Sequence, residues 1–472
     1  MIHSPLAKCR IVLAATCFFV LMGMTIRADA DDSKPNFVFI IADDLTFRDL
    51  GVYGGQAHTP NIDHLATQGM RMTRCFQTAP MCSPTRHNIY TGQYPIKTGA
   101  YPNHTQTYDD VKNITHYLSA LGYRVALSGK THIGPRNLFQ FEYTGKNNNP
   151  DMEAISQLFS ECQSSDTPFC LFACSNEPHT PWNKGDASQY PPSEIVLPPY
   201  IGDTPTVREH FSRYLAEITY FDQQVGDILN LLEKNNLVDN TVVMVVSEQG
   251  NSLPFAKWTC YDNGLQSGMI VRWPGHIAPG STTDAMVEYC DVTPTFVDIA
   301  GGKLAPELDG KSMLPVLLGK ADHHKDYVFG EMTTHGIING TDCYPIRSVR
   351  SEKFKLIRNL NFEEEFTNAC TSTQPYLSMV EAAENGNETI AALVERYQHR
   401  PEIEFYDVVN DPLELNNLAD DPQYKDEIAE LGWVLDKWMK QQGDEGIETE
   451  LSANSHVQKK KKQQKNSKRK SK

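Results

Sequence analysis

The chain of 472 residues lacks a hydrophobic run long enough to cross a lipid bilayer. A membrane-spanning helix needs about 20 apolar residues, whereas the apolar run near the amino end extends only from Ile11 to Met24. Glycine and proline are not enriched, at 30 and 28 residues, and hydrophobic residues make up 40%. This composition excludes collagen-like, disordered and disulfide-stapled classes. It predicts one large globular domain with a smaller one beside it.

Positive charge is scarce except at the carboxyl end. The net charge is −16, yet residues 459–472 hold nine Lys or Arg and no acid, so the rest of the chain is more acidic than the whole. An acidic surface repels nucleic acid, and we therefore expect no nucleic-acid partner. The low-complexity tail, residues 451–472, is predicted to be disordered and solvated, with a tether to a polyanion or a membrane surface as the alternative.

Residues 1–30 are typical of a secretory signal peptide. Lys8 and Arg10 precede the apolar run, and Ala28-Asp29-Ala30 has the small-x-small form of a cleavage site. An uncleaved anchor is the alternative. We expect an exported protein, in the bacterial periplasm or secreted, with the lysosome as the alternative and no stable membrane insertion after cleavage.

Paired Cys-x-x-Cys spacings are absent, so the cysteines give no indication of a zinc site. Removal of the signal would leave an odd number of them. If one is chemically modified, eight remain, which is compatible with some disulfides in an exported chain. The nine are Cys75, Cys82, Cys162, Cys170, Cys174, Cys260, Cys290, Cys343 and Cys370.

Apolar β-rich runs alternate with helical patterns along the first two thirds of the chain. This alternation predicts an α/β fold with a mostly parallel central sheet between helices. Ligands of such sheets bind beyond the carboxyl ends of the strands, so the polar residues that follow the runs are expected to converge. The runs are Phe37–Ile41, Val125–Leu127, Phe169–Ala173, Thr241–Val246 and Met269–Arg272, and the clearest helices are 112–121 and 207–232.

The pattern changes near residue 343. Short amphipathic strands are expected at Ile346–Arg350, Lys353–Arg358 and Glu404–Val408, followed by a helix near Lys425–Met439. We therefore predict a large domain over residues 31–342 and a small antiparallel α+β subdomain over residues 343–450.

A motif near residue 82 carries the strongest chemical signal. Cys82-Ser83-Pro84-Thr85-Arg86 has the form Cys-x-Pro-x-Arg, and it follows the amino-terminal segment PNFVFIIADDL by some forty residues. In both features the chain resembles the type I sulfatases, in which this cysteine is oxidised after translation to formylglycine (3-oxoalanine). The alternative is that Cys82 is an ordinary buried thiol.

The resemblance extends through most of the mature chain. Gly129-Lys130-Thr131-His132 is similar to a Gly-Lys-x-His element of the family, and His179-Thr180-Pro181 to a His-x-Pro element. Glu248-Gln249 and Lys257, the latter in PFAKW, look closest to the heparan N-sulfatase (sulfamidase) branch. The resemblance implies an alkaline-phosphatase-like sandwich fold and a sulfatase of sulfated saccharides that is matured by a formylglycine-generating enzyme.

The resemblance also implies one calcium ion. Its ligands would be Asp43, Asp44, Glu248, Gln249 and an oxygen derived from Cys82. Carboxylate and amide oxygens suit calcium or magnesium, and an ion there would neutralise the substrate anion before attack. Glu248-Gln249 departs from the commoner Asp-Asn or Asp-His of the family, which leaves the ligand count open. The alternative for Asp43-Asp44 is a solvated loop or a helix cap.

Family roles carry over to five further residues. One hydroxyl of the hydrated aldehyde would attack sulfur, and the other would later expel sulfate. Arg86, Lys130 and Lys257 would bind the sulfate and the leaving oxygen, His179 would protonate the leaving group, and His132 would be the base of the second step. We also consider Tyr261, Asp262, Glu331 and His335 as candidates to line the substrate pocket.

Two other functions stay open. A phosphodiesterase or phosphonate monoester hydrolase could share the nucleophile and the metal, and a glycan-binding protein could retain the site without catalysis. The sequence leaves undetermined the glycan, the choice between O-sulfate and N-sulfate, and exo or endo action.

Overall fold

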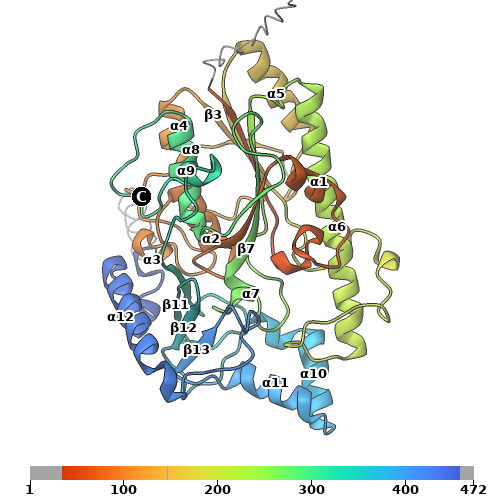
Figure 1. Ribbon diagram of the computed structural model, residues 1–472, viewed down its shortest axis with the longest axis vertical. Helices are drawn as coiled ribbons and strands as arrows, with labels where there is room; N and C mark the ends of the chain where they lie inside the picture. The colour runs from red at the N-terminus through yellow and green to blue at the C-terminus, as the bar shows by residue number, and fades with distance from the viewer. Residues whose placement is uncertain (1–33, 146, 458–472) are drawn as a thin grey trace, which may run out of the picture. The chain divides into compact units, whose positions relative to one another are not determined.

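A nine-stranded sheet forms the centre of the protein in a computed structural model that describes residues 34–145 and 147–457 (Figure 1). The predicted signal peptide and the predicted tail beyond residue 457 lie outside the described residues. The strand order is β4-β3-β5-β1-β6-β7-β2-β8, with β9 beside β2. The strands are β1 (Asn36–Ile41), β2 (Met70–Phe76), β3 (Arg124–Gly129), β4 (Glu142–Thr144), β5 (Phe169–Cys174), β6 (Thr241–Val246), β7 (Gln266–Arg272), β8 (Ser281–Thr283) and β9 (Val287–Glu288).

The mostly parallel sheet expected from the apolar runs is confirmed. β4, β3, β5, β1 and β6 run parallel, whereas β7 pairs antiparallel with β6 and with β2. Every residue of β1, β5, β6 and β7 is buried, which is why these strands read as continuous apolar runs. Strands β4 and β8, of three residues each, are more exposed and gave no such signal.

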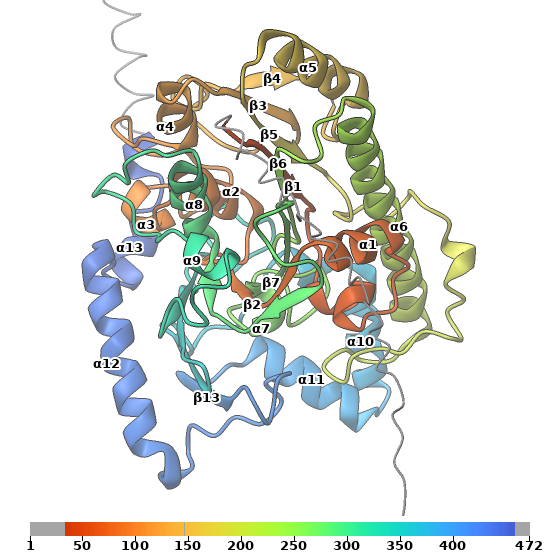
Figure 2. The same cartoon turned by 45° about the horizontal axis from the view of Figure 1, so that its top comes forward.

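Helices cover both faces of this sheet (Figure 2). Val38 and Ile40 of β1 belong to the core on the side of α6, while Phe37 and Phe39 belong to the core on the side of α8. This alternation is the two-residue period of a strand buried on both faces. The helices are α1 (Pro60–Gln68), α2 (Cys82–Thr91), α3 (Pro95–Thr98), α4 (Ile114–Ala120), α5 (Met152–Ser165), α6 (Pro205–Lys234), α7 (Asp262–Leu265), α8 (Val292–Ile299), α9 (Leu314–Leu317), α10 (Gln374–Glu384), α11 (Glu388–Gln398), α12 (Lys425–Gln442) and α13 (Ile447–Leu451).

The longest helix, α6, confirms the predicted helix over residues 207–232. Thr204 caps it by accepting a hydrogen bond from the Val207 amide, and Pro205 occupies its first turn. Among the residues that the structure describes, no helix combines the length and the apolar character needed to span a membrane.

A second, antiparallel sheet follows along the chain. Its order is β10 (Val328–Met332), β11 (Ile346–Arg350), β12 (Phe354–Asn359) and β13 (Ile403–Asp407), and α12 packs against it. β10 precedes residue 343, so the antiparallel sheet begins earlier than the predicted subdomain. The helices α10 and α11 are inserted between β12 and β13, and α10 packs against α6 of the large domain.

The described residues extend to 457, a few positions into the tail predicted for residues 451–472. Helix α13 ends at Leu451, Ala453 is buried with Ile96 and Tyr101, and the ring of His456 hydrogen-bonds the carbonyl oxygen of Gln106. The last described segment therefore packs against the loop that contains residues 101–106.

The nine cysteines of the described residues form no disulfide, although their number was compatible with some. All nine are free, and all but Cys343 are buried. Cys162, Cys170 and Cys174 belong to the two hydrophobic cores, so they serve as small apolar side chains.

Gly129 ends β3 directly before Lys130 and has no room for a side chain. Its φ is 96°, and a Cβ atom would lie 2.0 Å from the carbonyl oxygen of Cys174 on β5. We expect Gly129→Ala to lower the free energy of unfolding by about 1–2 kcal/mol for its positive φ, and by about 1–3 kcal/mol more for the clash. Gly122→Ala is the matched control, because Gly122 has φ 88° with nothing within 4 Å. Urea unfolding curves that match for the two variants would contradict the clash.

Candidate active site

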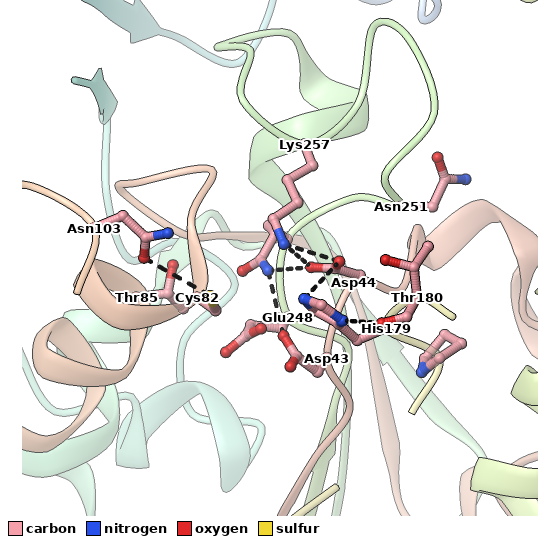
Figure 3. Close-up of polar contacts among 12 residues, drawn as sticks. Asp43, Asp44, Cys82, Thr85, Asn103, His179, Thr180, Glu248, Asn251 and Lys257 are labelled. Carbon is pink, nitrogen blue, oxygen red and sulfur yellow. Dashed lines mark hydrogen bonds and ion pairs between the residues drawn. The ribbon is translucent and has the colours of Figure 1, made fainter. Parts of the chain in front are cut away.

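Four neighbouring parallel strands deliver polar residues to one edge of the large sheet. Lys130 follows β3, Asp43 and Asp44 follow β1, and Glu248 follows β6. His179 lies on the loop after β5, which pairs with both β3 and β1. The convergence expected from the strand pattern therefore occurs in the structure (Figure 3).

Cys82 is the first residue of α2, and the whole of this helix is buried. Met81 precedes it in an extended conformation, and the Thr85 hydroxyl donates a hydrogen bond of 2.6 Å to the Ala79 carbonyl, which fixes the turn into the helix. Burial raises the pKa of the Cys82 thiol to about 12, so the unmodified side chain is a neutral thiol at neutral pH. Such a thiol is a poor nucleophile.

The carboxylates of Asp43, Asp44 and Glu248 form a buried acidic cluster. One oxygen of each lies within 4.8 Å of the others. Asp44 has φ 64°, a left-handed conformation that Asp tolerates better than most residues. Because consecutive side chains of an extended strand point to opposite faces, this turn allows the two aspartates to face one site.

The cluster fits a hard divalent cation. It offers only oxygen atoms, the donors that calcium and magnesium prefer. Oε2 of Glu248 and Oε1 of Gln249 are buried and have no hydrogen-bond partner among the described residues. Nε2 of Gln249 lies 2.6 Å from Oδ1 of Asp44, so a half-turn of the amide would direct its oxygen to the carboxylates.

Three cations balance the acids. Lys257 Nζ lies 2.6 Å from Asp44 Oδ1, Arg86 Nε lies 2.8 Å from Glu248 Oε1, and Lys130 contacts Asp43. Burial lowers the pKa of Lys130 to about 8. Despite its burial, the carboxylate of Glu248 keeps the pKa of the Arg86 guanidinium above its usual value. The three cations thus offset the three carboxylates, and all six groups lie in or beneath one site.

The two histidines have different surroundings. Nδ1 of His179 lies 2.6 Å from the Thr180 carbonyl oxygen and therefore carries a proton, while Nε2 lies 3.7 Å from Asp44 Oδ2. Asp44 raises the pKa of His179, but burial and the lysines outweigh it and leave the pKa lowered. Burial, together with Lys130 and Arg86, lowers the pKa of His132 far below its usual value, so that ring is neutral.

A cavity of about 480 Å³ opens over the site. Predicted residues in its lining are Asp44, Cys82, Lys130, His132, His179 and Lys257. Asp43, Arg86, Glu248 and Gln249 are fully buried beneath it. The structure thus brings all ten predicted site residues into and under one cavity.

The sequence did not identify several lining residues. Asn103 and His104 come from the loop after α3, and the ring of His104 lies 4.6 Å from that of His132. Trp258, Ile337, Cys370 and Thr373 complete the opposite wall. Trp258 belongs to the PFAKW motif but was given no role, whereas the other positions carry no recognisable motif. Thr373 directly precedes an inserted helix that the sequence did not predict.

The four candidate pocket residues are not among those that line the cavity. Asp262 pairs with Lys355 and Arg350, at 2.7 and 3.0 Å, and the Tyr261 hydroxyl donates to Glu404. Glu331 is buried under α3, where it accepts a hydrogen bond from the Ile96 amide, and the amide of His335 donates to Glu450. Tyr261 and Asp262 therefore join the large sheet to the small one. His335 is exposed and adjoins Gly336, which lines the cavity, so its place at the pocket stays a prediction.

Comparison with known proteins identifies the family. A model of the sulfatase family matches residues 35–302, and one for the carboxyl-terminal part of N-sulphoglucosamine sulphohydrolase matches residues 250–376. An ulvan-active sulfatase of Formosa agariphila is 34% identical over 435 residues, which cover 89% of this chain and 83% of that protein. The N-sulphoglucosamine sulphohydrolase of Homo sapiens is 28% identical over 462 residues, covering 85% of this chain and 89% of the human protein.

Solved structures agree in fold. The structure of BT4656 in complex with its substrate D-glucosamine-2-N,6-O-disulfate has a TM-score of 0.66 at 19% identity, and the match covers 88% of this chain and 99% of that chain. The expected alkaline-phosphatase-like sandwich and the resemblance to the sulfamidase branch are both confirmed. The chain belongs to the sulfatase family, and it is a sulfuric ester hydrolase.

Proposed function

We propose that this sulfatase hydrolyses a sulfate ester or a sulfamate of a sulfated saccharide. The observation that carries the proposal is the placement of Cys82 beside three buried carboxylates and three cations under one cavity. The relatives support the substrate class, since one is named for ulvan, one for N-sulphoglucosamine, and BT4656 was solved with a glucosamine disulfate.

Cys82 is proposed to be the precursor of formylglycine, made by a formylglycine-generating enzyme. The hydrated aldehyde would supply the nucleophile that a neutral thiol cannot. Because Cys82 is only 2% exposed in the folded chain, the maturation enzyme must reach it before the chain folds. Export through the signal peptide, to the periplasm or the exterior, is proposed as well, with the lysosome as the alternative.

Asp43, Asp44, Glu248 and Gln249 are proposed to hold one calcium ion together with an oxygen derived from Cys82. When bound, the ion would supply charge neutralisation and Lewis acidity at the sulfate. The ion would take the place of Lys130 and Lys257 beside Asp43 and Asp44. The two lysines would then be free to contact the sulfate oxygens. Arg86, fixed by Glu248, would hold residue 82 and the anion in place.

Proton transfer divides between the histidines. The ring of His179 is oriented by the Thr180 carbonyl, which leaves Nε2 to carry the proton for the leaving group. Its lowered pKa makes the protonated ring a stronger acid. His132 is neutral, and its buried Nδ1 has no hydrogen-bond partner in the described part of the chain, as suits a base.

Co-expression with a maturation enzyme is expected to convert Cys82 to an aldehyde. Peptide mass spectrometry and labelling by an aminooxy probe would detect it, and Cys82→Ala should lose both the label and all turnover of 4-nitrophenyl sulfate. Cys343→Ala is the matched control, because Cys343 is a thiol outside the cavity lining. Full activity of protein with an unmodified Cys82 would overturn the mechanism. Turnover of an aryl phosphate diester in place of the sulfate would favour the phosphodiesterase.

Calcium is expected to stabilise the wild type, by about 2.7 kcal/mol at a hundredfold excess over its Kd. The Asp44→Asn variant should not be stabilised by calcium, because the substitution removes a charged ligand from the cluster. Asp49→Asn should keep the stabilisation, since Asp49 is buried nearby but bonded to the Tyr214 hydroxyl and is not part of the cluster. Thermal unfolding with and without calcium measures the stabilisation of each variant. If calcium stabilised Asp44→Asn as much as the wild type, Asp44 would not be a ligand.

Substitution of the two histidines should give different results. His179→Ala should lower kcat/KM by about 10²- to 10⁴-fold on a sulfated saccharide, whose leaving group needs a proton, and much less on 4-nitrophenyl sulfate. His132→Ala should impair both substrates and leave sulfate trapped on residue 82. The control is His64→Ala, on the exposed face of α1. Equal losses on both substrates for His179→Ala, with no adduct for His132→Ala, would reverse the assignment.

A further inference from the structure

A second cavity adjoins the one over the active site. Its volume is about 290 Å³, and it shares Thr180, Ser252 and Thr373 with the larger cavity. Thr180 directly follows His179, the residue proposed to protonate the leaving group. The second cavity therefore begins beside the residue proposed to protonate the leaving group.

The second cavity is lined by groups suited to a sugar. Trp182, Pro181, Leu253 and Pro375 supply apolar surface for the C–H face of a ring, and Gln374 supplies an amide. Trp182 is held in place, since its Nε1 donates a hydrogen bond of 2.7 Å to the Pro178 carbonyl oxygen and its ring packs at 5.4 Å from that of Tyr214. The wall is thus formed before a ligand binds.

The charge of the lining has one sign. Arg213 supplies a positive charge from α6, and His210, whose pKa is lowered by burial and by Arg213, supplies a neutral ring that can donate a hydrogen bond. No carboxylate is among the residues that line this cavity. Arg213 is paired at 2.5 Å with Glu209, but both side chains are about half exposed, and such surface pairs contribute little. Its guanidinium is therefore available to an incoming anion. In a chain of net charge −16, a lining without an acid favours an anionic ligand.

The junction of the two cavities holds a polar atom without a partner. The hydroxyl of Ser252 is buried and makes no hydrogen bond within residues 34–145 and 147–457. Unsatisfied buried hydroxyls are unfavourable, so this one is suited to a ligand atom that passes from one cavity to the next.

We propose that the second cavity binds the sugar unit next to the one that loses sulfate, and that this unit carries an anionic group, which Arg213 and His210 recognise. The proposal rests on the proposed saccharide sulfatase and extends it from one sugar unit to at least two. The shared chemistry is an anion on a pyranose, either a carboxylate or a second sulfate.

The test compares Arg213→Ala, Arg213→Lys and Lys234→Ala with the wild type. Substrates are 4-nitrophenyl sulfate and size-fractionated ulvan and heparin oligosaccharides, native and carboxyl-reduced. Arg213→Ala should raise KM on the preferred oligosaccharide at least about tenfold more than on the aryl sulfate, since a charge-assisted hydrogen bond is lost. Arg213→Lys should restore part of the affinity. Lys234→Ala removes a positive charge from the far end of α6 and should leave both substrates unchanged.

Carboxyl reduction distinguishes the two sources of the anion. If it abolishes the difference between the wild type and Arg213→Ala, the recognised group is a carboxylate, and if it does not, the group is a sulfate. Calorimetric titration of the same oligosaccharides into Cys82→Ala protein, with and without Arg213→Ala, measures their binding affinity in the absence of turnover. Equal affinities there, or equal KM changes on aryl and oligosaccharide substrates, would overturn the inference. Absence of all turnover by the mature wild type would instead refute the proposed function.

Discussion

The active site depends on holding three buried carboxylates together. Asp43, Asp44 and Glu248 place oxygens within 4.8 Å of one another at fully buried positions. Isolated buried charges of one sign are prohibitively unfavourable, so each acid has a cationic partner at contact distance. The same lysines that balance the acids are the groups proposed to hold the substrate, so stability and ligand binding compete for the same charges.

The order of strands in the large sheet brings the cations and the carboxylates together. Strand β1 lies between β5 and β6, and its carboxyl end carries the two aspartates, so residues from both neighbours reach them over short distances. Helix α2 then aims its amino end, with Cys82, at the same place, where its backbone N–H groups favour negative charge. Substitutions that shift β3 or β5 by a fraction of an ångström therefore act on the charge balance as well as on packing.

Much of this arrangement could be predicted from the sequence. β1, β6 and α6 are long, strongly patterned elements whose residues are buried as their periodicity indicates. The site residues could be named because they stand in contiguous motifs after strand ends. Short edge strands such as β4 and the mixed-polarity β2 (MRMTRCF) lack a comparable signal, since half-exposed positions tolerate many residue types.

The features that the sequence did not predict depend on tertiary contacts. Asp262 follows Tyr261 in a segment close to the Lys257 motif, and only the fold shows that its carboxylate faces Lys355 and Arg350 of the small sheet. The cavity wall from Ile337 to Thr373 is likewise assembled from segments more than 200 residues away from Cys82, a separation that no local pattern encodes. The cysteines illustrate a further limit, because their number was compatible with some disulfides, whereas the structure shows nine free thiols, eight of them buried.

The packing of the last described segment has a consequence for biosynthesis. His456 bonds the backbone of Gln106, and Tyr101 donates to the carbonyl of Thr449, so the loop that carries Asn103 and His104 is supported by residues that follow it in the chain by 350 and 348 positions. This part of the cavity wall cannot be completed until Thr449 and His456 have been added to the chain. A growing chain that still lacks them leaves the loop of Asn103 and His104 without these two hydrogen bonds, so this side of the cavity over residue 82 is completed late.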